Sequence, residues 1–348
     1  MRIEDEIKLT FDDVLIRPKR STLVSRSEVV LERQFKFKHT NEIWTGVPIF
    51  SANMDTTGTF ETAITLQKHK MLTAIHKFYS IKDWEKNVEK LDPNFISVTV
   101  GQSKEDLQLG KKIFSLNSDI KYLCIDVANG YREDFINSVK NYRETFPDKI
   151  IIAGNVATRE MTEALILAGA DIVKIGIGPG SVCTTRSVAG VGYPQLSSIS
   201  ECSDAAHGLG GHVMADGGCK YPGDVSKAFG AGADYVMLGG MFAGHKESGG
   251  ELVTDEEGVQ YKDFYGMSST KAQQTYYGDL AEHRAPEGKK VRLRYKGELD
   301  KTVQSILGGM RSACSYVGAK KLKDLPKSTT FIRVTQTTNE IFTGSENI

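Results

Sequence analysis

The chain has 348 residues, of which 40% are hydrophobic and 25% charged, a composition typical of ordinary globular proteins that excludes disordered and fibrous classes. Its 44 basic side chains balance 44 acidic ones, so there is no bulk positive field to hold nucleic acid or an anionic membrane. Residues 1–20 lack a signal-peptide pattern, and no later run approaches a span of roughly 20 apolar residues. We therefore expect a cytoplasmic protein without nucleic-acid or membrane partners.

Residues 1–46 come before the first apolar run, and we expect them to cap one end of the domain or to reach a neighbouring subunit. Short apolar or β-branched runs follow, each too short and too uniformly apolar for an amphipathic helix. Such runs are typical of strands buried on both faces of a parallel sheet. The eight runs begin at Val47, Met71, Phe95, Tyr122, Ile150, Asp171, His212 and Asp234.

Segments with helical spacing lie between these runs, as in residues 160–170 and 223–233. Both end in the same phrase, Ala-Gly-Ala-Asp, at 168–171 and 231–234, which indicates one repeated unit. Eight alternating strands and helices favour a closed (β/α)8 barrel, the TIM barrel, over an open doubly wound sheet. We predict an α/β fold with a single domain over residues 1–348. Residues of about 245–298 are polar and interrupt the last unit after strand eight, so we expect a mobile lid there.

Paired glycines follow the last two predicted strands. Asp216-Gly217-Gly218 follows the seventh strand and Gly239-Gly240 follows the eighth. In this architecture the loops after these strands commonly hold phosphate, and glycines let bare backbone amides approach an anion. Asp216 suits the hydroxyl groups of a ribose. Each pair alone could simply turn the chain, but together they favour a sugar phosphate or a nucleotide.

A cysteine lies in an irregular loop after the sixth strand. Residues 176–186 read GIGPGSVCTTR, and the glycines and proline force a tight backbone whose carbonyl groups can turn inward toward a cation. Cys183 lies near Arg186 and between hydroxyl side chains, as expected of a nucleophilic thiol. The other four cysteines, Cys124, Cys202, Cys219 and Cys314, are expected to be small buried hydrophobic residues.

This loop, with the following Val191-Gly192-Tyr193-Pro194-Gln195, resembles the signature of the IMP dehydrogenase and GMP reductase family, and the resemblance runs through nearly the whole chain. It implies that Cys183 forms a covalent thioimidate with carbon 2 of a purine nucleotide. It also implies that Ser181 contacts the 5′-phosphate. Potassium would be bound by the carbonyl groups of Gly178, Gly180 and Cys183, with Arg186 nearby, and the subunits would form a homotetramer.

Two features favour the reductase branch of the family, in which NADPH converts GMP to IMP and ammonia. Lys77 is followed by an ordinary helical segment, with no room for the regulatory modules that dehydrogenases usually insert. Residues 274–278 lack the Arg-Tyr pair with which dehydrogenases activate water, whereas residues 281–289 resemble the reductase lid. His283 and Pro286 depart from that lid pattern.

The resemblance assigns further roles by position. Thr185 and Glu287 would relay the proton that turns the amine into a leaving group. The purine and its phosphate would be held by Ser181, Asp216, Gly217, Gly218, Gly239, Gly240, Gly266, Met267, Ser268, Arg284 and Gly288. The cofactor would lie against Ser25 and Arg26 of an adjacent subunit, and against Lys77, Asp126, Val127, Ala128, Met267, His283, Arg284, Ser312, Ala313, Cys314 and Ser315.

Three alternatives remain at this point. The first is an IMP dehydrogenase without its regulatory insert, which would need a water-activating base outside the Arg-Tyr pattern. The second is a non-catalytic nucleotide sensor, which has no need of a reactive thiol. The third is an unrelated phosphate-binding barrel enzyme, from which only the cysteine loop separates this chain.

Overall fold

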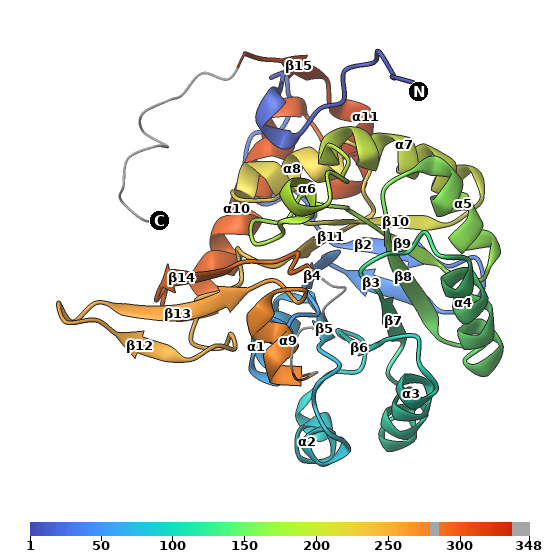
Figure 1. Cartoon of the computed structure of the whole chain (residues 1–348). Helices are drawn as coiled ribbons and strands as arrows, with labels where there is room; N and C mark the ends of the chain where they lie inside the picture. Colours follow the sequence, from blue (N-terminus) through green and yellow to red (C-terminus); the bar gives the residue numbers. More distant parts are fainter. Residues whose placement is uncertain (277, 279–284, 336–348) are drawn as a thin grey trace.

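Eight parallel strands close into a barrel at the centre of the computed structural model, which describes residues 1–276, 278 and 285–335 (Figure 1). The barrel runs in chain order from β4 to β11, and β11 pairs back with β4. Its strands are β4 (Ile49–Ser51), β5 (Leu72–Ile75), β6 (Ile96–Val100), β7 (Tyr122–Asp126), β8 (Ile150–Val156), β9 (Ile172–Ile175), β10 (His212–Asp216) and β11 (Tyr235–Leu238). Each strand overlaps one predicted apolar run, with β8 extending two residues beyond its run, so the (β/α)8 prediction is confirmed.

Helices surround this barrel and bury their apolar faces against it. Ser80 and Ser103 cap two of them through reciprocal bonds with Asp83 and Asp106, which satisfies the free amides of the first turn. The α-helices outside the insertion are α1 (Phe60–Leu66), α2 (Ile81–Asn87), α3 (Lys104–Leu116), α4 (Glu133–Thr145), α5 (Arg159–Leu167), α6 (Thr185–Val188), α7 (Gln195–Gly208), α8 (Pro222–Gly230), α10 (Leu299–Val317) and α11 (Leu325–Ser328). Short 3-10 helices are η1 (Phe11–Asp13), η2 (Arg26–Glu28), η3 (Gln67–His69), η4 (Val88–Lys90) and η5 (Leu322–Asp324).

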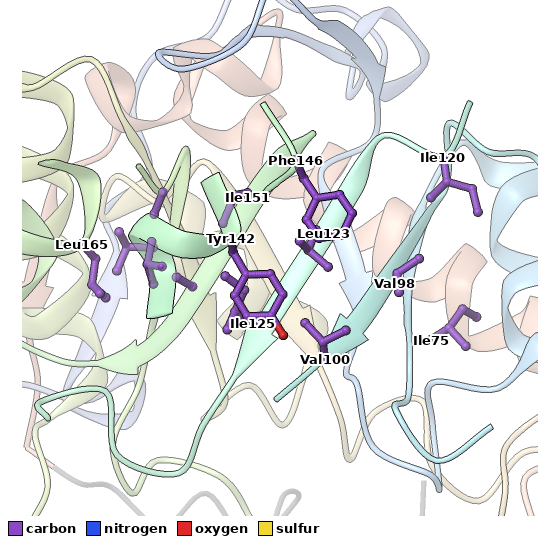
Figure 2. Close-up of a cluster of buried hydrophobic side chains, with 14 of the residues drawn as sticks. Ile75, Val98, Val100, Ile120, Leu123, Ile125, Tyr142, Phe146, Ile151 and Leu165 are labelled. Atoms are coloured by element: carbon purple, nitrogen blue, oxygen red, sulfur yellow. The ribbon is translucent and has the colours of Figure 1, made fainter. Parts of the chain in front are cut away.

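Apolar side chains fill the space between strands and helices in two clusters. Figure 2 shows Leu123 and Ile125 of β7 beside Tyr142 of α4, with Ile151 of β8 and Leu165 of α5 in the same cluster. All five side chains are fully or almost fully buried. Burial of this kind stabilises the fold by about 25 cal/mol for each Å² of apolar surface removed from water. Among the helices described, none is both long and apolar enough to cross a membrane.

A hairpin of the N-terminal extension closes the bottom of the barrel. Strands β2 (Arg33–Lys36) and β3 (Ile43–Gly46) pair in antiparallel fashion. The ring of Phe35 stacks on Tyr235 at 4.5 Å, and the ring of Trp44 meets Tyr122 edge-on at 6.1 Å. Tyr122 and Tyr235 begin their strands, so these contacts lie at the amino-terminal end, as the sequence predicts. Earlier in the same extension, β1 (Val14–Ile16) pairs with β15 (Phe331–Arg333).

The repeated Ala-Gly-Ala-Asp phrase has the same role at both of its positions. Gly169 and Gly232 adopt φ values of +117° and +112°, which glycine tolerates and which end each helix. The following aspartates then accept backbone N–H groups of the preceding strand, Asp171 from Ile151 at 3.0 Å and Asp234 from Val213 at 3.1 Å. The repeat therefore joins consecutive β/α units at the barrel bottom.

The segment between β11 and α10 carries its own small sheet, which the polar sequence did not indicate. Strands β12 (Leu252–Thr254), β13 (Gln260–Tyr265) and β14 (Lys290–Arg294) are antiparallel, and α9 (Thr270–Tyr276) lies between the last two. The hydroxyl groups of Tyr265 and Tyr276 donate to Asp55 Oδ2 at 2.5 and 2.6 Å. The ring of Tyr276 also stacks on Phe78 at 3.6 Å. These contacts join the insertion to the loops that follow β4 and β5.

Candidate active site

A cavity opens at the carboxyl ends of the barrel strands, where barrel enzymes carry their active sites. Its walls come from loops after β4, β7, β8, β9 and β10 and from two stretches of the insertion. Twelve of the 28 predicted site residues line this cavity, among them all three predicted catalytic residues. The lining consists of Ala52, Asn53, Met54, Asp126, Val127, Ala128, Asn155, Lys174, Gly176, Ile177, Gly178, Gly180, Val182, Cys183, Thr185, Asp216, Gly266, Met267, Ser268 and Glu287.

The three predicted catalytic residues form a chain of contacts in this cavity. Cys183 Sγ lies 3.3 Å from Thr185 Oγ1, and the hydroxyl of Thr185 donates to Glu287 Oε2 at 2.6 Å. Cys183 and Glu287 are 104 positions apart in the sequence, yet backbone bonds hold their segments together. Thr184 N donates to Glu287 O at 3.0 Å, and Lys289 N donates to Val182 O at 2.9 Å. A proton therefore has a path from the thiol to the carboxylate.

Cys183 differs from the other cysteines in its surroundings. Cys124, Cys202 and Cys314 are fully buried, as predicted, whereas Cys219 is only half-buried. Burial raises the pKa of Cys124 to about 12, and that of Cys202 and Cys314 to about 11. Burial likewise raises the pKa of Cys219 well above its ordinary value. These four thiols are therefore held protonated at neutral pH. Of the five cysteines, only Cys183 lines the cavity.

The loop before Cys183 has the backbone shape that its glycines suggested. Gly178 has a φ of +81°, and a Cβ atom there would lie 2.7 Å from Cγ of Arg186. The side chain of Arg186 packs over this glycine and donates to the carbonyl of Tyr193 at 2.7 Å. Gly180 O accepts a bond from Cys183 N at 3.1 Å. Arg186 thus holds the loop through its contacts with Gly178 and Tyr193.

Three glycine-rich loops meet beside the cavity. Gly217 and Gly218 adopt φ values of +89° and +90°, and a Cβ atom on Gly217 would lie 3.2 Å from the amide nitrogen of Gly180. A Cβ atom on Gly240 would lie 3.1 Å from Ser181 Oγ. The predicted phosphate residues of β9, β10 and β11 are therefore adjacent in space. Gly239 belongs to the same turn.

A buried ionic network forms the floor of the cavity, and the sequence reasoning missed its centre. Lys174 Nζ lies 2.5 Å from Asp126 Oδ1 and 3.0 Å from Asp216 Oδ2. Burial works against the charge of Lys174, but the two carboxylates outweigh it and raise its pKa. Asn155 also donates to Asp216 Oδ2 at 2.9 Å. A lysine inside the otherwise apolar run at 171–177 was the available signal.

On the nicotinamide side predicted from the sequence, Val127 and Ala128 line the cavity beside Asp126. Burial opposes the charge of Asp126, but Lys174 and then Lys77 overcome this effect, so its pKa lies below the ordinary value. Lys77 is half-buried and close enough to act on Asp126 electrostatically, although it is not in the cavity wall.

On the lid side, Gly288 lies against Gly266. A Cβ atom added to Gly266 would be 3.2 Å from the Cα atom of Gly288.

Other predicted cofactor residues lie elsewhere in the chain. Ser25 and Arg26 are exposed at η2, and Ser312 and Ala313 line a separate groove with Ser226 and Tyr316. Ser315 is half-buried one turn farther along α10. The thiol of Cys314 is fully buried in the core, so its side chain is not available to a ligand. His283 and Arg284 fall outside the described residues.

Fold and site together define a (β/α)8 barrel with a cysteine-centred cavity at its mouth. Residues 8–341 match the family model described as "IMP dehydrogenase / GMP reductase domain", and the chain belongs to this family. It is 58% identical over 345 residues to the GMP reductases of Buchnera aphidicola subsp. Acyrthosiphon pisum (strain Tuc7) and Escherichia coli O81 (strain ED1a). It is 57% identical to the GMP reductase of Enterobacter sp. (strain 638). Each alignment covers 98% of this chain and 99% of the relative.

Proposed function

We propose that this protein catalyses the NADPH-dependent reductive deamination of GMP to IMP and ammonia, through a covalent thioimidate on Cys183. The observation that carries the proposal is the contact chain from Cys183 Sγ through Thr185 Oγ1 to Glu287 Oε2. Full-length relatives named GMP reductase support the choice of substrate. The activity would serve purine nucleotide salvage and interconversion.

The reaction begins with addition of the Cys183 sulfur to carbon 2 of GMP. The thiol proton passes through the hydroxyl of Thr185, and Glu287 returns a proton to the exocyclic amine. Ammonia then leaves, and carbon 2 remains bound to sulfur as a thioimidate. When bound, NADPH supplies the hydride that reduces this carbon. The carbon–sulfur bond would then break with its electron pair going to sulfur, and IMP would leave while the Cys183 thiolate takes up one proton from solvent to regenerate the thiol.

GMP would be oriented by two groups of residues. Ser181 and the glycine pairs at 217–218 and 239–240 would present hydroxyl and amide groups to the 5′-phosphate. Asp216 would accept from the ribose, and its link to Lys174 fixes the direction in which its carboxylate points. Gly266, Met267, Ser268 and Gly288, with Arg284, would close over the purine.

The cofactor would lie across the barrel mouth beside Asp126, Val127, Ala128 and Lys77. Its far end would reach Ser312, Ala313, the backbone of Cys314 and Ser315, together with Ser25 and Arg26 of a neighbouring subunit in a homotetramer. Within one chain Ser312 and Ala313 line a groove separate from the cavity, and Ser25 and Arg26 line neither, which favours a cofactor site shared between subunits. Met267 and Arg284 would contact both GMP and the cofactor, and His283 would contact the cofactor alone. The enzyme is expected to work in the cytoplasm.

The loop at residues 178–183 fits a potassium ion. Gly178 has a positive φ, which reorients its peptide group relative to that of an L-residue in the common regions of φ and ψ. Backbone carbonyl oxygens are ligands for hard cations. The carbonyls of Gly178, Gly180 and Cys183 would hold the ion, with Arg186 packed against the loop. The ion would fix the backbone that presents the Cys183 thiol.

The experiment compares two reactions of the purified protein. Oxidation of NADPH with GMP, together with equal amounts of ammonia and IMP, is the expected result. The dehydrogenase alternative predicts instead reduction of NAD with IMP and formation of XMP. A non-catalytic sensor would bind GMP without any turnover, and that outcome would also reject the proposal.

A further inference from the structure

Two histidines and a carboxylate meet at the barrel bottom, at the opposite end from the cavity. His207 belongs to α7, His212 begins β10, and Asp234 immediately precedes β11. One ligand atom from each lies within 4.8 Å of the others. His207 Nε2 is 2.7 Å from Asp234 Oδ2, and His212 Nδ1 is 3.4 Å from the same oxygen. The catalytic proposal makes no use of these side chains.

The tautomer of His212 decides what this cluster can bind. His212 Nε2 lies 2.9 Å from the carbonyl oxygen of Lys36, so this nitrogen carries a hydrogen and donates it. In the neutral ring Nδ1 then holds a lone pair. That lone pair is buried, has no hydrogen-bond partner and faces a carboxylate oxygen. Two acceptors opposed in this way need either a proton or a metal ion between them.

The spacing is close to that around a tetrahedral metal ion. With metal–ligand distances of about 2.0 to 2.2 Å, neighbouring ligands of zinc are roughly 3.3 to 3.5 Å apart. The distance from His212 Nδ1 to Asp234 Oδ2 is 3.4 Å. His207 Nε2 is too close at 2.7 Å and would have to move outward by about 0.6 to 0.8 Å. Its side chain is 47% exposed at the end of a helix, which gives it room to do so.

Neighbouring residues orient the proposed ligands. A metal-bound histidine commonly donates its other ring N–H to a carbonyl, as His212 does to Lys36. The rings of Phe35 and Phe37 meet the His212 ring edge-on at 5.2 and 5.7 Å and fix its plane. Arg33 donates to the other carboxylate oxygen, Asp234 Oδ1, at 3.1 Å, while Oδ2 accepts from Val213 N at 3.1 Å and also faces the two histidines.

We propose that His207, His212 and Asp234 form a site for one divalent transition-metal ion, of which zinc best matches two imidazoles and a carboxylate. Water would complete the coordination on the exposed side of His207. The charge of Arg33 opposes a dication, so the site should bind more weakly than a four-ligand structural zinc site. Metal bound here joins α7, β10 and β11, and the Lys36 contact extends this connection to the N-terminal hairpin.

Cobalt(II) tests this proposal, because its visible absorption reports tetrahedral coordination and distinguishes thiolate from nitrogen and oxygen ligands. The protein would carry Cys183→Ser, so that the reactive thiol does not bind the metal. We expect one cobalt per subunit, visible bands without a thiolate charge-transfer band, displacement by zinc, and a zinc-induced rise in Tm. His207→Gln should weaken binding at least tenfold. The matched control is His69→Gln, which removes a histidine that pairs with a single carboxylate, Asp300, at 2.6 Å.

Two results would overturn the proposal. One is equal cobalt binding by the His207→Gln and His69→Gln variants, which would place the metal elsewhere. The other is a His212 ring that NMR shows doubly protonated at neutral pH and unchanged by excess zinc. In that case a proton, and no metal, lies between His212 and Asp234. Neither result bears on GMP turnover, so the catalytic proposal is tested separately.

Discussion

Replacement of Glu287 by glutamine tests the proton path with almost no change in shape. Thr185 Oγ1 lies 2.6 Å from Glu287 Oε2 and 3.3 Å from Cys183 Sγ, so the carboxylate is one hydroxyl away from the reacting sulfur. An amide keeps the size of the group but accepts no proton. A positioned acid or base typically contributes about 10² to 10⁴-fold, or roughly 3 to 5 kcal/mol of barrier. We expect kcat to fall by this factor while KM for GMP changes less than about threefold.

A half-reaction isolates the step that Glu287 serves. IMP and NADP⁺ can form the same thioimidate in reverse, with release of NADPH, and no ammonia leaves in that direction. Rapid mixing of Glu287→Gln with IMP and NADP⁺ should therefore still give a burst of nearly one NADPH per subunit. Glu298→Gln is the control, because Glu298 is an exposed glutamate at the end of the same insertion. Turnover of GMP within about threefold of the unmodified protein, or equal loss of both reactions, would refute the reasoning.

Three further changes test the surroundings of the site. Lys174→Met leaves two half-buried carboxylates without their lysine partner, so denaturant unfolding should show a loss of about 3 kcal/mol, and a loss below about 1 kcal/mol would contradict the network. Tyr276→Phe removes a bond to Asp55, so hydrogen exchange in α9 should accelerate about tenfold, whereas an unchanged rate would show that the bond does not hold the helix. Burial lowers the pKa of His76 from 6.5 to about 4, so its stabilising effect is complete above pH 6.5 and is lost as the pH falls toward 4. His76→Asn should reduce that acid loss by up to about 3 kcal/mol, and an equally steep loss would exclude His76 as its source.

The barrel was predictable because its signal is local. Each strand is a short apolar run, and the repeated phrase before Asp171 and Asp234 places a helix end and a strand start within four residues. The small sheet of the insertion gave no such signal. Strand β14 (Lys290–Arg294) alternates charged, exposed side chains with two half-buried apolar ones, but this period-2 pattern spans only five residues within a long polar segment. Its pairing with β13 is set by tertiary contacts that a single sequence does not contain.

The site was predictable in part, for a similar reason. The glycine-rich loop marked Cys183 by its own composition, and the resemblance to a family supplied Glu287 from a distant segment. Lys174 was missed because a lysine in an apolar strand becomes meaningful only when the ends of β7 and β10 bring two aspartates to it. The metal cluster was missed likewise, since His207 and Asp234 approach each other only when α7 packs beside the barrel.

The most direct test of the central claim is peptide mass spectrometry of enzyme quenched in acid during turnover of GMP with limiting NADPH. The account predicts that the peptide containing Cys183 gains the mass of GMP less one ammonia, and that Cys183→Ser shows neither the adduct nor turnover. An unmodified Cys183 peptide in a sample that is forming IMP, or an adduct on another cysteine, would contradict covalent catalysis at this residue.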